Sequence, residues 1–353
     1  DGARFVQASQ LSLAGSGIGS FSDRGRDAAR GGGCCDDAAA TVANPGWLNA
    51  AGRLADAEQR RLADLVRVGL AGTLRDFSMT TADGRVRRLS EIDYARQPAG
   101  YASQPQEVVN YVENHDNQTL FDIQVLKLPR DTPPEGRARV QVLGVALTAF
   151  SQGVAYLHAG VELMRSKSGD RNSFDSGDWF NRIDWTLQDN GWGAGLPPER
   201  ESGGFWPVLK PLLADPAIKP RPAQIRFVRD ASLDLLRIRA GTPLLRLRTA
   251  AEVQQRLRFF NTGPVARADV MLAHLDGRGL PGAGHADLVY AINAGTTAAE
   301  LPMPGLEGRA LVLHPVHTAP DAADPRPAQA ARWDAARATI TVPPRTALVF
   351  VNR

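Results

Sequence analysis

The apolar positions along the chain follow two periods, and the change between them divides the sequence in two. In the first part, apolar residues recur at helical spacing over 56–70 and over 135–150, which predicts two helices. Short apolar runs over 108–114 and 153–160 have the length and the flanking residues of buried strands. The order strand, loop, helix, strand predicts parallel strands joined by a helical crossover.

The connections around these elements differ in length. A long polar loop over 116–134 follows the first strand, whereas only 151–153 leads into the second. This asymmetry is typical of a (β/α) barrel, in which the chemistry lies at the carboxyl ends of the strands. Asp56 is expected to cap the first helix, with Gln59 at the capping-box position. A short helix is also expected over 22–30, inside a segment rich in glycine.

From about residue 249 the pattern changes to short apolar or alternating runs, which Gly, Pro and Asp-Gly turns separate. These runs are LVYAINA (288–294), RALVLHPV (309–316), ATITV (338–342) and TALVFV (346–351). Strands in such close succession, with no helix between them, predict an antiparallel β-sandwich. We therefore assign residues 1–248 to an α/β, barrel-like domain and residues 249–353 to an all-β sandwich domain.

Composition and charge argue against two classes of partner. The 353 residues are 43% apolar and carry a net charge of +3, which fits a globular protein with a full core. The basic residues are nearly all arginine and form no dense run with interleaved aromatic residues, so no nucleic-acid partner is expected. No apolar stretch has the length that a bilayer requires, so no membrane partner is expected either.

Two local features concern the chain's first residues. The two cysteines, Cys34 and Cys35, are adjacent, and because neighbouring cysteines rarely bridge we expect free thiols. The first residue is not methionine, and residues 1–10 lack the basic and apolar regions of a signal peptide. We therefore expect the chain to begin inside a longer protein.

Four polar residues end the strand predicted over 108–114, namely Asn114, His115, Asp116 and Asn117. An imidazole beside a carboxylate fits a metal site, a base with its orienting group, or a site that binds sugar hydroxyls. A metal site is disfavoured because no further ligands are suitably spaced, and a nucleophile with its base because no GxSxG motif is present. A polar strand cap without chemical function accounts for the four residues about as well as a sugar site does.

A second polar cluster, residues 165–185, follows the second predicted strand. It combines Arg, Asp and Asn with aromatic residues that include Trp179. Aromatic platforms beside charged hydrogen-bonding groups are typical of carbohydrate sites. Asp178 and Arg182 are four residues apart, so a helical turn would place them on one face. The spacing also fits a surface ion pair.

Other polar residues carry weaker signals. His314 and His317 lie beyond a sandwich strand and are interpreted as turn histidines rather than metal ligands. His158 lies on an apolar strand and is interpreted as a hydrogen-bonded core histidine. Glu162 follows it at the strand end, where a structural and a functional role fit equally well.

Three long segments resemble one family of enzymes. They are YVENHDNQTLFD (111–122), GVAYLHAGVELMRSKSGDRNSFDSGDWFNRIDW (153–185) and ASQLSLAGSGIGSFSDRGRDAARGGG (8–33). All three closely resemble bacterial pullulanases and limit dextrinases, which are debranching members of the alpha-amylase superfamily of glycoside hydrolases. The resemblance implies the last three strands and helices of a (β/α)8 barrel, followed by the sandwich. It also implies hydrolysis, with retention, of α-1,6 linkages in pullulan, amylopectin and limit dextrins.

The resemblance also implies roles for individual residues. Asp116 matches the family's third catalytic carboxylate, which stabilises the transition state, and His115 matches its neighbour that binds sugar hydroxyls. Asn117 is taken as a further substrate contact. Asp178 and Arg182 match a pair that contacts the −2 glucose, and the adjacent Trp179 is assigned to substrate binding. Calcium sites occur in this superfamily, but we find no ligand set and predict no cofactor or metal.

Retaining hydrolysis also needs a nucleophile and an acid/base carboxylate. The family's motifs for these, which resemble GFRFD and GEGW, are not in the sequence. QIRFVRD (224–230) is expected in a helix and is rejected. Glu113 is a poor substitute, because on a continuing strand it and Asp116 point to opposite faces. The chain alone is therefore expected to be inactive, with the N-terminal part of the enzyme as its partner. The alternative is a non-catalytic glucan-binding or partner-dependent module.

Overall fold

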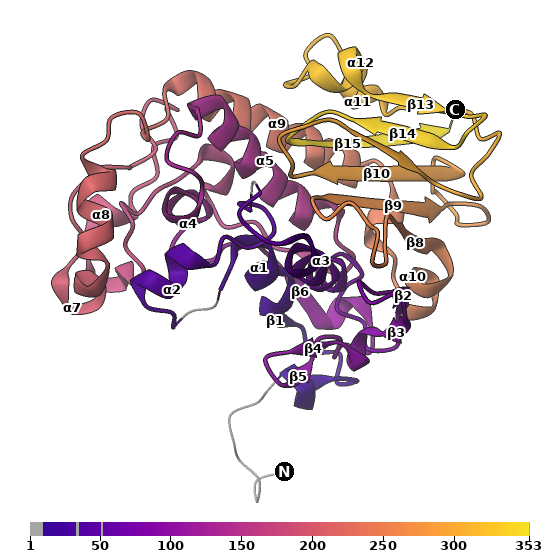
Figure 1. The fold of residues 1–353 in the computed structure, drawn as a ribbon, viewed down its shortest axis with the longest axis horizontal. Helices are drawn as coiled ribbons and strands as arrows, with labels where there is room; N and C mark the ends of the chain where they lie inside the picture. Colours follow the sequence, from indigo (N-terminus) through magenta and orange to yellow (C-terminus); the bar gives the residue numbers. More distant parts are fainter. Residues whose placement is uncertain (1–9, 33–34, 51, 353) are drawn as a thin grey trace, which may run out of the picture.

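A computed structural model describes residues 10–32, 35–50 and 52–352 (Figure 1). The chain forms a mixed α/β region, which contains a small parallel sheet, and a C-terminal region of two antiparallel sheets. Figure 1 shows the antiparallel strands to one side of the helices, with β10 and β15 near α5 and α9. Within the described residues, none of the helices is both long and apolar enough to cross a bilayer.

The parallel sheet has the strand order β1-β6-β7. Its strands are short: β1 (Ser20–Ser22), β6 (Val108–Asn110) and β7 (Val154–Ala155). Ser20 pairs with Val108, and Val109 pairs in turn with Val154, both in parallel register. The two predicted parallel strands are therefore present, but each is shorter than the apolar runs over 108–114 and 153–160. The prediction that the second strand is buried is wrong, because Val154 is exposed and Ala155 is half-buried.

Four helices accompany this sheet, α1 (Asp23–Arg30), α3 (Asp56–Leu70), α5 (Pro134–Phe150) and α9 (Pro222–Ala240). They confirm the helices predicted over 22–30, 56–70 and 135–150, and the helical assignment of 224–230. The predicted cap is wrong, because α3 begins after Ala55, which makes no side-chain cap bond, and Asp56 lies in the first turn. There its carboxylate still interacts favourably with the helix dipole.

Helices α1 and α3 cross at two glycines, Gly25 and Gly69. A Cβ atom at Gly25 would lie 3.1 Å from the Cα of Gly69, and one at Gly69 would lie 3.2 Å from the Cα of Gly25. These distances leave little room for a side chain at either position, so the close approach of the two helices depends on glycine.

The loop predicted over 116–134 is wrong in part, because it contains the helix α4 (Leu120–Lys127). Thr119 caps this helix by accepting a hydrogen bond from the backbone N–H of Asp122 at 3.1 Å. Every residue of α4 is buried. A helix buried on all sides shows no alternation of apolar and polar faces, which is the pattern that sequence reading depends on.

Short helices and hairpins complete the mixed region. The helices are α2 (Ala38–Ala43), α6 (Asp178–Asn181), α7 (Glu199–Ser202), α8 (Trp206–Leu213) and α10 (Ala250–Arg256). The hairpin strands are β2 (Ser78–Thr80), β3 (Val86–Arg88), β4 (Asp93–Tyr94) and β5 (Gln97–Pro98).

The C-terminal region contains a five-stranded sheet of order β12-β15-β10-β9-β8 and a three-stranded sheet of order β11-β14-β13. The strands are β8 (Leu257–Phe260), β9 (Val270–Asp276), β10 (Asp287–Asn293), β11 (Ala299–Pro302), β12 (Leu311–Leu313), β13 (Arg332–Asp334), β14 (Thr339–Val342) and β15 (Thr346–Asn352). The run predicted over 309–316 is only in part a strand, since α11 (Pro315–Thr318) follows β12 at once, and α12 (Arg326–Ala330) precedes β13.

Strand β10 is buried on both faces, which explains its continuous apolar run. Val289 and Ala291 belong to the core between the two antiparallel sheets. Leu288 and Tyr290 belong to the larger core that the helices share, where the rings of Tyr290 and Phe150 of α5 lie 5.2 Å apart. The larger core thus runs from the helices onto the five-stranded sheet, and the domain boundary at residue 249 stays a prediction.

The cysteine prediction is wrong for Cys35, which is disulfide-bonded. No free cysteine is found in the part of the chain that the structure describes. Cys34 lies outside the described residues.

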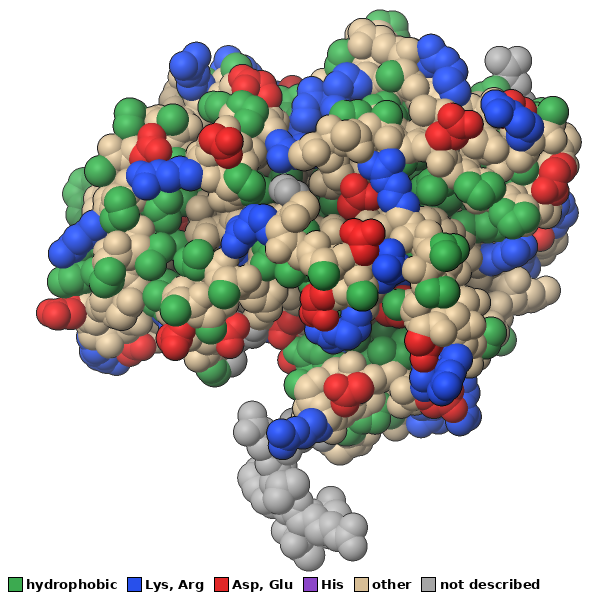
Figure 2. Space-filling model, in the orientation of Figure 1, with side chains coloured by type: hydrophobic (Ala, Val, Ile, Leu, Met, Phe, Trp, Pro, Cys, Tyr) green, Lys and Arg blue, Asp and Glu red, His purple; other side chains and the backbone are tan. Residues whose placement is uncertain are grey.

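The face of the molecule drawn in Figure 2 shows basic and acidic side chains interspersed rather than gathered by sign.

Candidate functional site

The loop over 113–120 follows strand β6 and carries the first predicted site residues. The side chains of His115 and Asp116 are 74% and 67% exposed, and His115 Nε2 lies 3.4 Å from Asp116 Oδ1. Asn114 is buried, and its Oδ1 accepts a hydrogen bond from the backbone N–H of Asp116 at 2.9 Å. Asn117 has a positive φ of 62°, a conformation that asparagine adopts more readily than most residues. The imidazole and the carboxylate are therefore presented together to solvent by a tightly turned backbone.

The ends of this loop are bound to each other and to neighbouring elements. Both carboxylate oxygens of Glu113 accept hydrogen bonds, one from the backbone N–H of Leu120 and the other from His158 Nδ1 at 2.9 Å. Glu113 is 1% exposed, which confirms that it does not accompany Asp116 at the surface. The hydrogen bond predicted for His158 is confirmed, but the prediction that it lies on a strand in the core is wrong, because His158 follows the end of β7 and is half-buried.

Arg30 of α1 fixes the same loop from a third direction. Its guanidinium donates to the carbonyl of Val112 at 3.2 Å and to that of Gln118 at 3.1 Å. Burial lowers the pKa of Arg30 to about 10, which still leaves it charged at neutral pH. The loop is thus held by buried groups, while only its tip is exposed.

The second predicted cluster, 165–185, divides into a buried and an exposed half. Arg165 through Asp170, apart from Gly169, are polar or charged and at most 8% exposed. Arg165 donates to the carbonyl of Asn181 at 2.6 Å, and Lys167 Nζ donates to the carbonyl of His115 at 3.1 Å. The buried half therefore organises other loops and does not itself face a ligand, contrary to the interpretation of the whole segment as a binding surface.

The exposed half presents aromatic rings. Trp179 is 70% exposed, as are Phe174 at 73% and Trp185 at 63%. Large apolar side chains of this kind usually pack inside a protein, so their exposure within one short segment makes this segment a candidate binding surface. The neighbouring Asp178 and Arg182 are also exposed.

Asp178 and Arg182 are joined by one helical turn but not by an ion pair. The backbone N–H of Arg182 donates to the carbonyl of Asp178 at 2.9 Å, as the predicted turn requires. The guanidinium instead lies 3.9 Å from the carboxylate of Asp189, which also binds Lys219 at 2.9 Å. The alternative of a surface ion pair between Asp178 and Arg182 is therefore wrong, and the carboxylate of Asp178 is left for other contacts.

Beside the loop, the end of β7 and helix α9 enclose a groove of about 240 Å³. Its lining includes Leu157, His158 and Glu162 from the β7 side, Trp185 from the exposed half, and Leu233 and Leu236 from α9. Glu162 accepts a hydrogen bond from the backbone N–H of Gly160 at 3.0 Å, which favours a structural role for it. The groove is mostly apolar, and Leu233 is 42% exposed.

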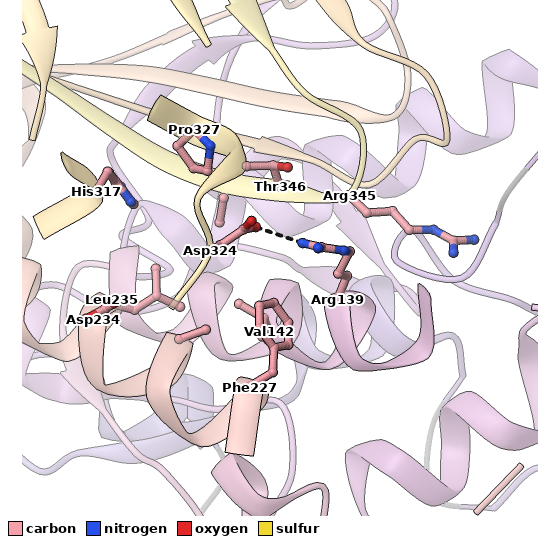
Figure 3. Close-up of a pocket in the computed structure, with 12 residues that line it drawn as sticks. Arg139, Val142, Phe227, Asp234, Leu235, His317, Asp324, Pro327, Arg345 and Thr346 are labelled. Atoms are coloured by element: carbon pink, nitrogen blue, oxygen red, sulfur yellow. Dashed lines mark hydrogen bonds and ion pairs between the residues drawn. The ribbon is translucent and has the colours of Figure 1, made fainter. Parts of the chain in front are cut away.

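A separate pocket lies between α5, α9 and the sandwich (Figure 3). Arg139 of α5 forms an ion pair with Asp324 at 2.8 Å across this boundary. His317 Nε2 accepts from the backbone N–H of Val349 at 3.1 Å, and burial lowers the pKa of His317 to about 4. His314 caps α11, whereas His317 lies within that helix and is buried, so the interpretation as turn histidines is wrong for His317. No residue of the 113–120 loop or the 165–185 segment lines this pocket.

Sequence reasoning missed the residues that support the site from inside. Lys167, Asp122 and Arg30 are buried charged groups with partners far away in sequence. The available signal was a charged residue among mostly apolar neighbours, as Asp122 is in α4. Over the described ranges, no group of three or more His, Cys, Asp or Glu side chains is placed to hold a metal ion.

Comparisons with known proteins give the class to which this fold and site belong. Residues 187–353 match the family described as alpha-1,6-glucosidases, pullulanase-type, C-terminal. The chain is 40% identical over 367 residues to pullulanase 1, chloroplastic, of Arabidopsis thaliana, which covers 100% of this chain and 38% of that protein. It is 41% identical over 303 residues to a pullulanase of Klebsiella pneumoniae, covering 82% of this chain and 28% of that protein.

Solved structures agree with the sequence matches. The maltotriose complex of PulA from Klebsiella pneumoniae superposes with a TM-score of 0.90 at 36% identity, over 98% of this chain and 38% of that one. The chain therefore belongs to the pullulanase-type alpha-1,6-glucosidases. Within that family it corresponds to the C-terminal region, and it spans about 38% of the length of its plant relative and of the PulA structure.

Proposed function

We propose that this chain is the C-terminal portion of a debranching enzyme that hydrolyses α-1,6-glucosidic linkages in pullulan, amylopectin and limit dextrins with retention of configuration. The observation that carries the proposal is the exposed pair His115 and Asp116 at the carboxyl end of a parallel strand. Parallel strands of α/β barrels deliver reactive side chains at this end. The sequence similarity to pullulanases supports the choice of substrate.

The proposed roles follow from the chemistry of each side chain. The carboxylate of Asp116 accepts hydrogen bonds from sugar hydroxyls and strengthens them as positive charge develops on the ring in the oxocarbenium-like transition state. His115 binds an adjacent hydroxyl, and Asn117 is a further polar contact. Trp179 offers a face against which the apolar side of a glucose ring stacks, while Asp178 and Arg182 bind hydroxyls of that sugar.

The nucleophile and the acid/base carboxylate would come from segments outside residues 1–353. In a retaining glycosidase, these two groups lie about 5–5.5 Å apart on either side of the bond to be cleaved. Glu113 is the acidic residue closest in sequence to Asp116, but it is buried, and His158 and Leu120 occupy both of its oxygens. It supports the exposed loop and is not a candidate for either role.

The exposed edges of the parallel sheet are evidence that other strands pair with this chain. Its edge strands are β1 and β7, and an exposed sheet edge pairs readily with another strand. Phe21 of β1 is 41% exposed and Val154 of β7 is 45% exposed. The apolar groove between β7 and α9 is lined by residues that begin at Leu157, shortly after Val154 in sequence. We infer that further strands of the same enzyme complete a (β/α)8 barrel on this sheet and fill the groove.

One observation favours the second candidate, a non-catalytic glucan-binding or partner-dependent module. The exposed carboxylate of Asp116 has an imidazole beside it rather than a second carboxylate. A site of this kind binds hydroxyls without breaking the glycosidic bond. The two candidates therefore share the same sugar site and differ in whether other segments bring the reacting groups to it.

The test compares the product of the complete reading frame that contains this chain with residues 1–353 alone. We expect the complete protein to release reducing ends from pullulan, and the anomer first formed to be the α-anomer by NMR. Residues 1–353 alone are expected to release none. Binding of maltotriose by a complete protein that hydrolyses no α-1,6 linkage would overturn the enzymatic proposal in favour of the module.

A further inference from the structure

Lysine 167 occupies an unusual position for a charged side chain. It is 1% exposed, and its ammonium group donates to the backbone carbonyl of His115 at 3.1 Å. Burial lowers the pKa of Lys167, while the nearby carboxylates of Asp122, Asp170 and Glu113 act in the opposite direction. Burying an ammonium is costly unless its charge and its donors are satisfied, so this contact needs a structural reason.

The backbone of Lys167 is itself fixed from helix α4. Asp122 is 0% exposed, and its carboxylate accepts from the backbone N–H of Lys167 at 2.8 Å and from the hydroxyl of Ser166. The same Ser166 oxygen accepts from the backbone N–H of Ser168 at 2.8 Å. A buried carboxylate with several donors holds a loop rigidly, because each bond lost would leave a polar group unpaired.

The loop that Lys167 contacts is closed at its base but open at its tip. Glu113 and Arg30 bind residues at both ends of the loop, as described above. At the tip, the backbone carbonyl of His115 receives Lys167, and the amide of the next residue, Asp116, is held by Asn114. The side chains of His115 and Asp116 are mostly exposed and contact each other at 3.4 Å, so their placement depends on these backbone contacts.

We propose that Lys167 is a positioning residue, which sets the place of the Asp116 carboxylate and the His115 imidazole by holding the carbonyl of His115. The proposal rests on the proposed sugar-binding role of Asp116. Asp122 and Ser166 act one step further back, because they fix the backbone from which Lys167 extends. The buried half of the 165–185 segment thus supports the 113–120 loop, while the exposed half presents its own side chains.

Lys127 provides a matched control. It is 0% exposed, and its ammonium group also donates to two backbone carbonyls, those of Gly31 and Asn44. Neither of these carbonyls belongs to the 113–120 loop. Lys127→Met therefore removes a comparable buried lysine side chain and its hydrogen bonds without releasing His115, whereas Lys167→Met releases it.

The first measurement is amide hydrogen exchange of the complete protein, resolved over residues 113–120. We expect Lys167→Met to accelerate exchange in this loop and Lys127→Met to leave it unchanged. Ser166→Ala, a small change that keeps Lys167, is expected to give a weaker acceleration and serves if Lys167→Met does not fold. Unchanged exchange in the loop of Lys167→Met, or of Ser166→Ala in its place, would overturn the proposal.

The second measurement is kinetic. For the folded enzyme we expect Lys167→Met to lower kcat on pullulan by about 10²-fold, the usual effect of a small misplacement of a reacting group, with a smaller change in KM. Lys127→Met is expected to leave kcat unchanged. Because Lys167 acts through Asp116, adding Lys167→Met to Asp116→Asn should cost no more than about a further twofold.

The outcomes separate the two proposals. A full additional loss in the double variant would show that Lys167 does not act through Asp116, which would overturn its role in placing that carboxylate. Faster exchange in the Lys167→Met loop, in a complete protein that does not cleave pullulan, would overturn the enzymatic proposal while supporting the hold of Lys167 on the loop.

Discussion

Glu113 and His158 join the ends of two neighbouring parallel strands. His158 Nδ1 donates to Glu113 at 2.9 Å, and the two side chains are 12% and 1% exposed. Because the second oxygen of Glu113 accepts from Leu120, one carboxylate connects the end of β7, the end of β6 and the start of α4. This residue fixes the base of the loop that presents Asp116.

The bond between these residues predicts a loss of stability in Glu113→Gln. The amide has one acceptor where the carboxylate has two, so its NH2 group must face the N–H of Leu120 or His158 Nδ1. The second arrangement requires the ring proton of His158 to move to Nε2, which faces Arg165 at 3.5 Å. We expect the free energy of unfolding to fall by about 1–3 kcal/mol, the cost of a buried group left unpaired. Urea denaturation of the wild type and of Glu113→Gln measures this difference in the free energy of unfolding.

Glu58→Gln is the control for that measurement. Glu58 binds Arg61 at 2.8 Å, but their side chains are 45% and 57% exposed. A solvent-exposed pair of this kind contributes at most about 1 kcal/mol. Equal losses in Glu58→Gln and Glu113→Gln would contradict the structural role that we assign to Glu113.

Asp116→Asn is expected to remove activity and leave the fold intact. The side chain is 67% exposed and contacts His115 only at 3.4 Å, so little folding free energy depends on it. In the complete enzyme we expect kcat on pullulan to fall by about 10²-fold or more, as it does when a group that stabilises developing charge is lost. Near-normal turnover with unchanged thermal unfolding would refute the assignment.

Two tryptophans should separate binding from stability. Trp179 is 70% exposed, whereas Trp192 is 2% exposed and packs edge-on against Phe121 at 5.8 Å. We expect Trp179→Ala to change the free energy of unfolding by less than about 0.5 kcal/mol and to weaken maltotriose binding in calorimetry. Trp192→Ala should cost about 3–5 kcal/mol of stability. Unchanged maltotriose affinity in Trp179→Ala would remove that residue from the site.

Periodicity recovered the elements whose apolar residues have a repeating pattern. Helices α3 and α5 were found at or within a residue of their ends because apolar residues recur along them at helical spacing. Helix α4 was missed because all of its residues are buried, and strand β6 was overestimated because buried loop residues extend its apolar run. Strand β7 was overestimated although it and most of the residues after it are partly exposed. An apolar run therefore reports neither burial nor hydrogen-bonded pairing by itself.

The sequence predicted the exposed residues of the candidate site but not the buried residues that support them. His115 and Asp116 were identified because they interrupt an apolar run where a strand ends. Lys167 was interpreted as part of a binding surface, because its buried contacts leave no sign in the sequence. Its contact with His115 joins residues 52 positions apart, and its contact with Asp122 joins residues 45 positions apart. Contacts of that range depend on the fold as a whole, so a single sequence gives no direct sign of them.

Asp178 and Arg182 should act independently of each other in stability. Arg182 lies 3.9 Å from Asp189 and makes only a backbone contact with Asp178. In a double-mutant cycle of Asp178→Ala and Arg182→Ala, we expect a coupling free energy below about 0.5 kcal/mol. A coupling well above that value would mean that the two side chains do form an ion pair in solution.

The buried carboxyl of Asp122 predicts a pH dependence of stability. Burial raises its pKa from 3.8 to about 6, an effect that the hydrogen bonds from Ser166 and Lys167 oppose. The folded protein therefore binds this proton more tightly than the unfolded chain does. The contribution of Asp122 to the free energy of unfolding is greatest below pH 4 and is lost as the pH rises through about 6, by roughly 3 kcal/mol.

Asp122→Asn isolates this contribution, since all other titrating groups are common to the two proteins. We expect the free energy of unfolding of the wild type minus that of the variant to fall between pH 4 and pH 6 in urea denaturation.

Asp184 is the opposite case, because the hydroxyl of Thr186 and backbone N–H groups lower its pKa to about 2. With Asp184→Asn the corresponding difference should stay flat over that range and fall only as the pH drops below about 4. A difference for Asp122→Asn that stays flat or rises from pH 4 to pH 6 would mean that this carboxylate is not held in a desolvated site, and would weaken the support that it gives to Lys167.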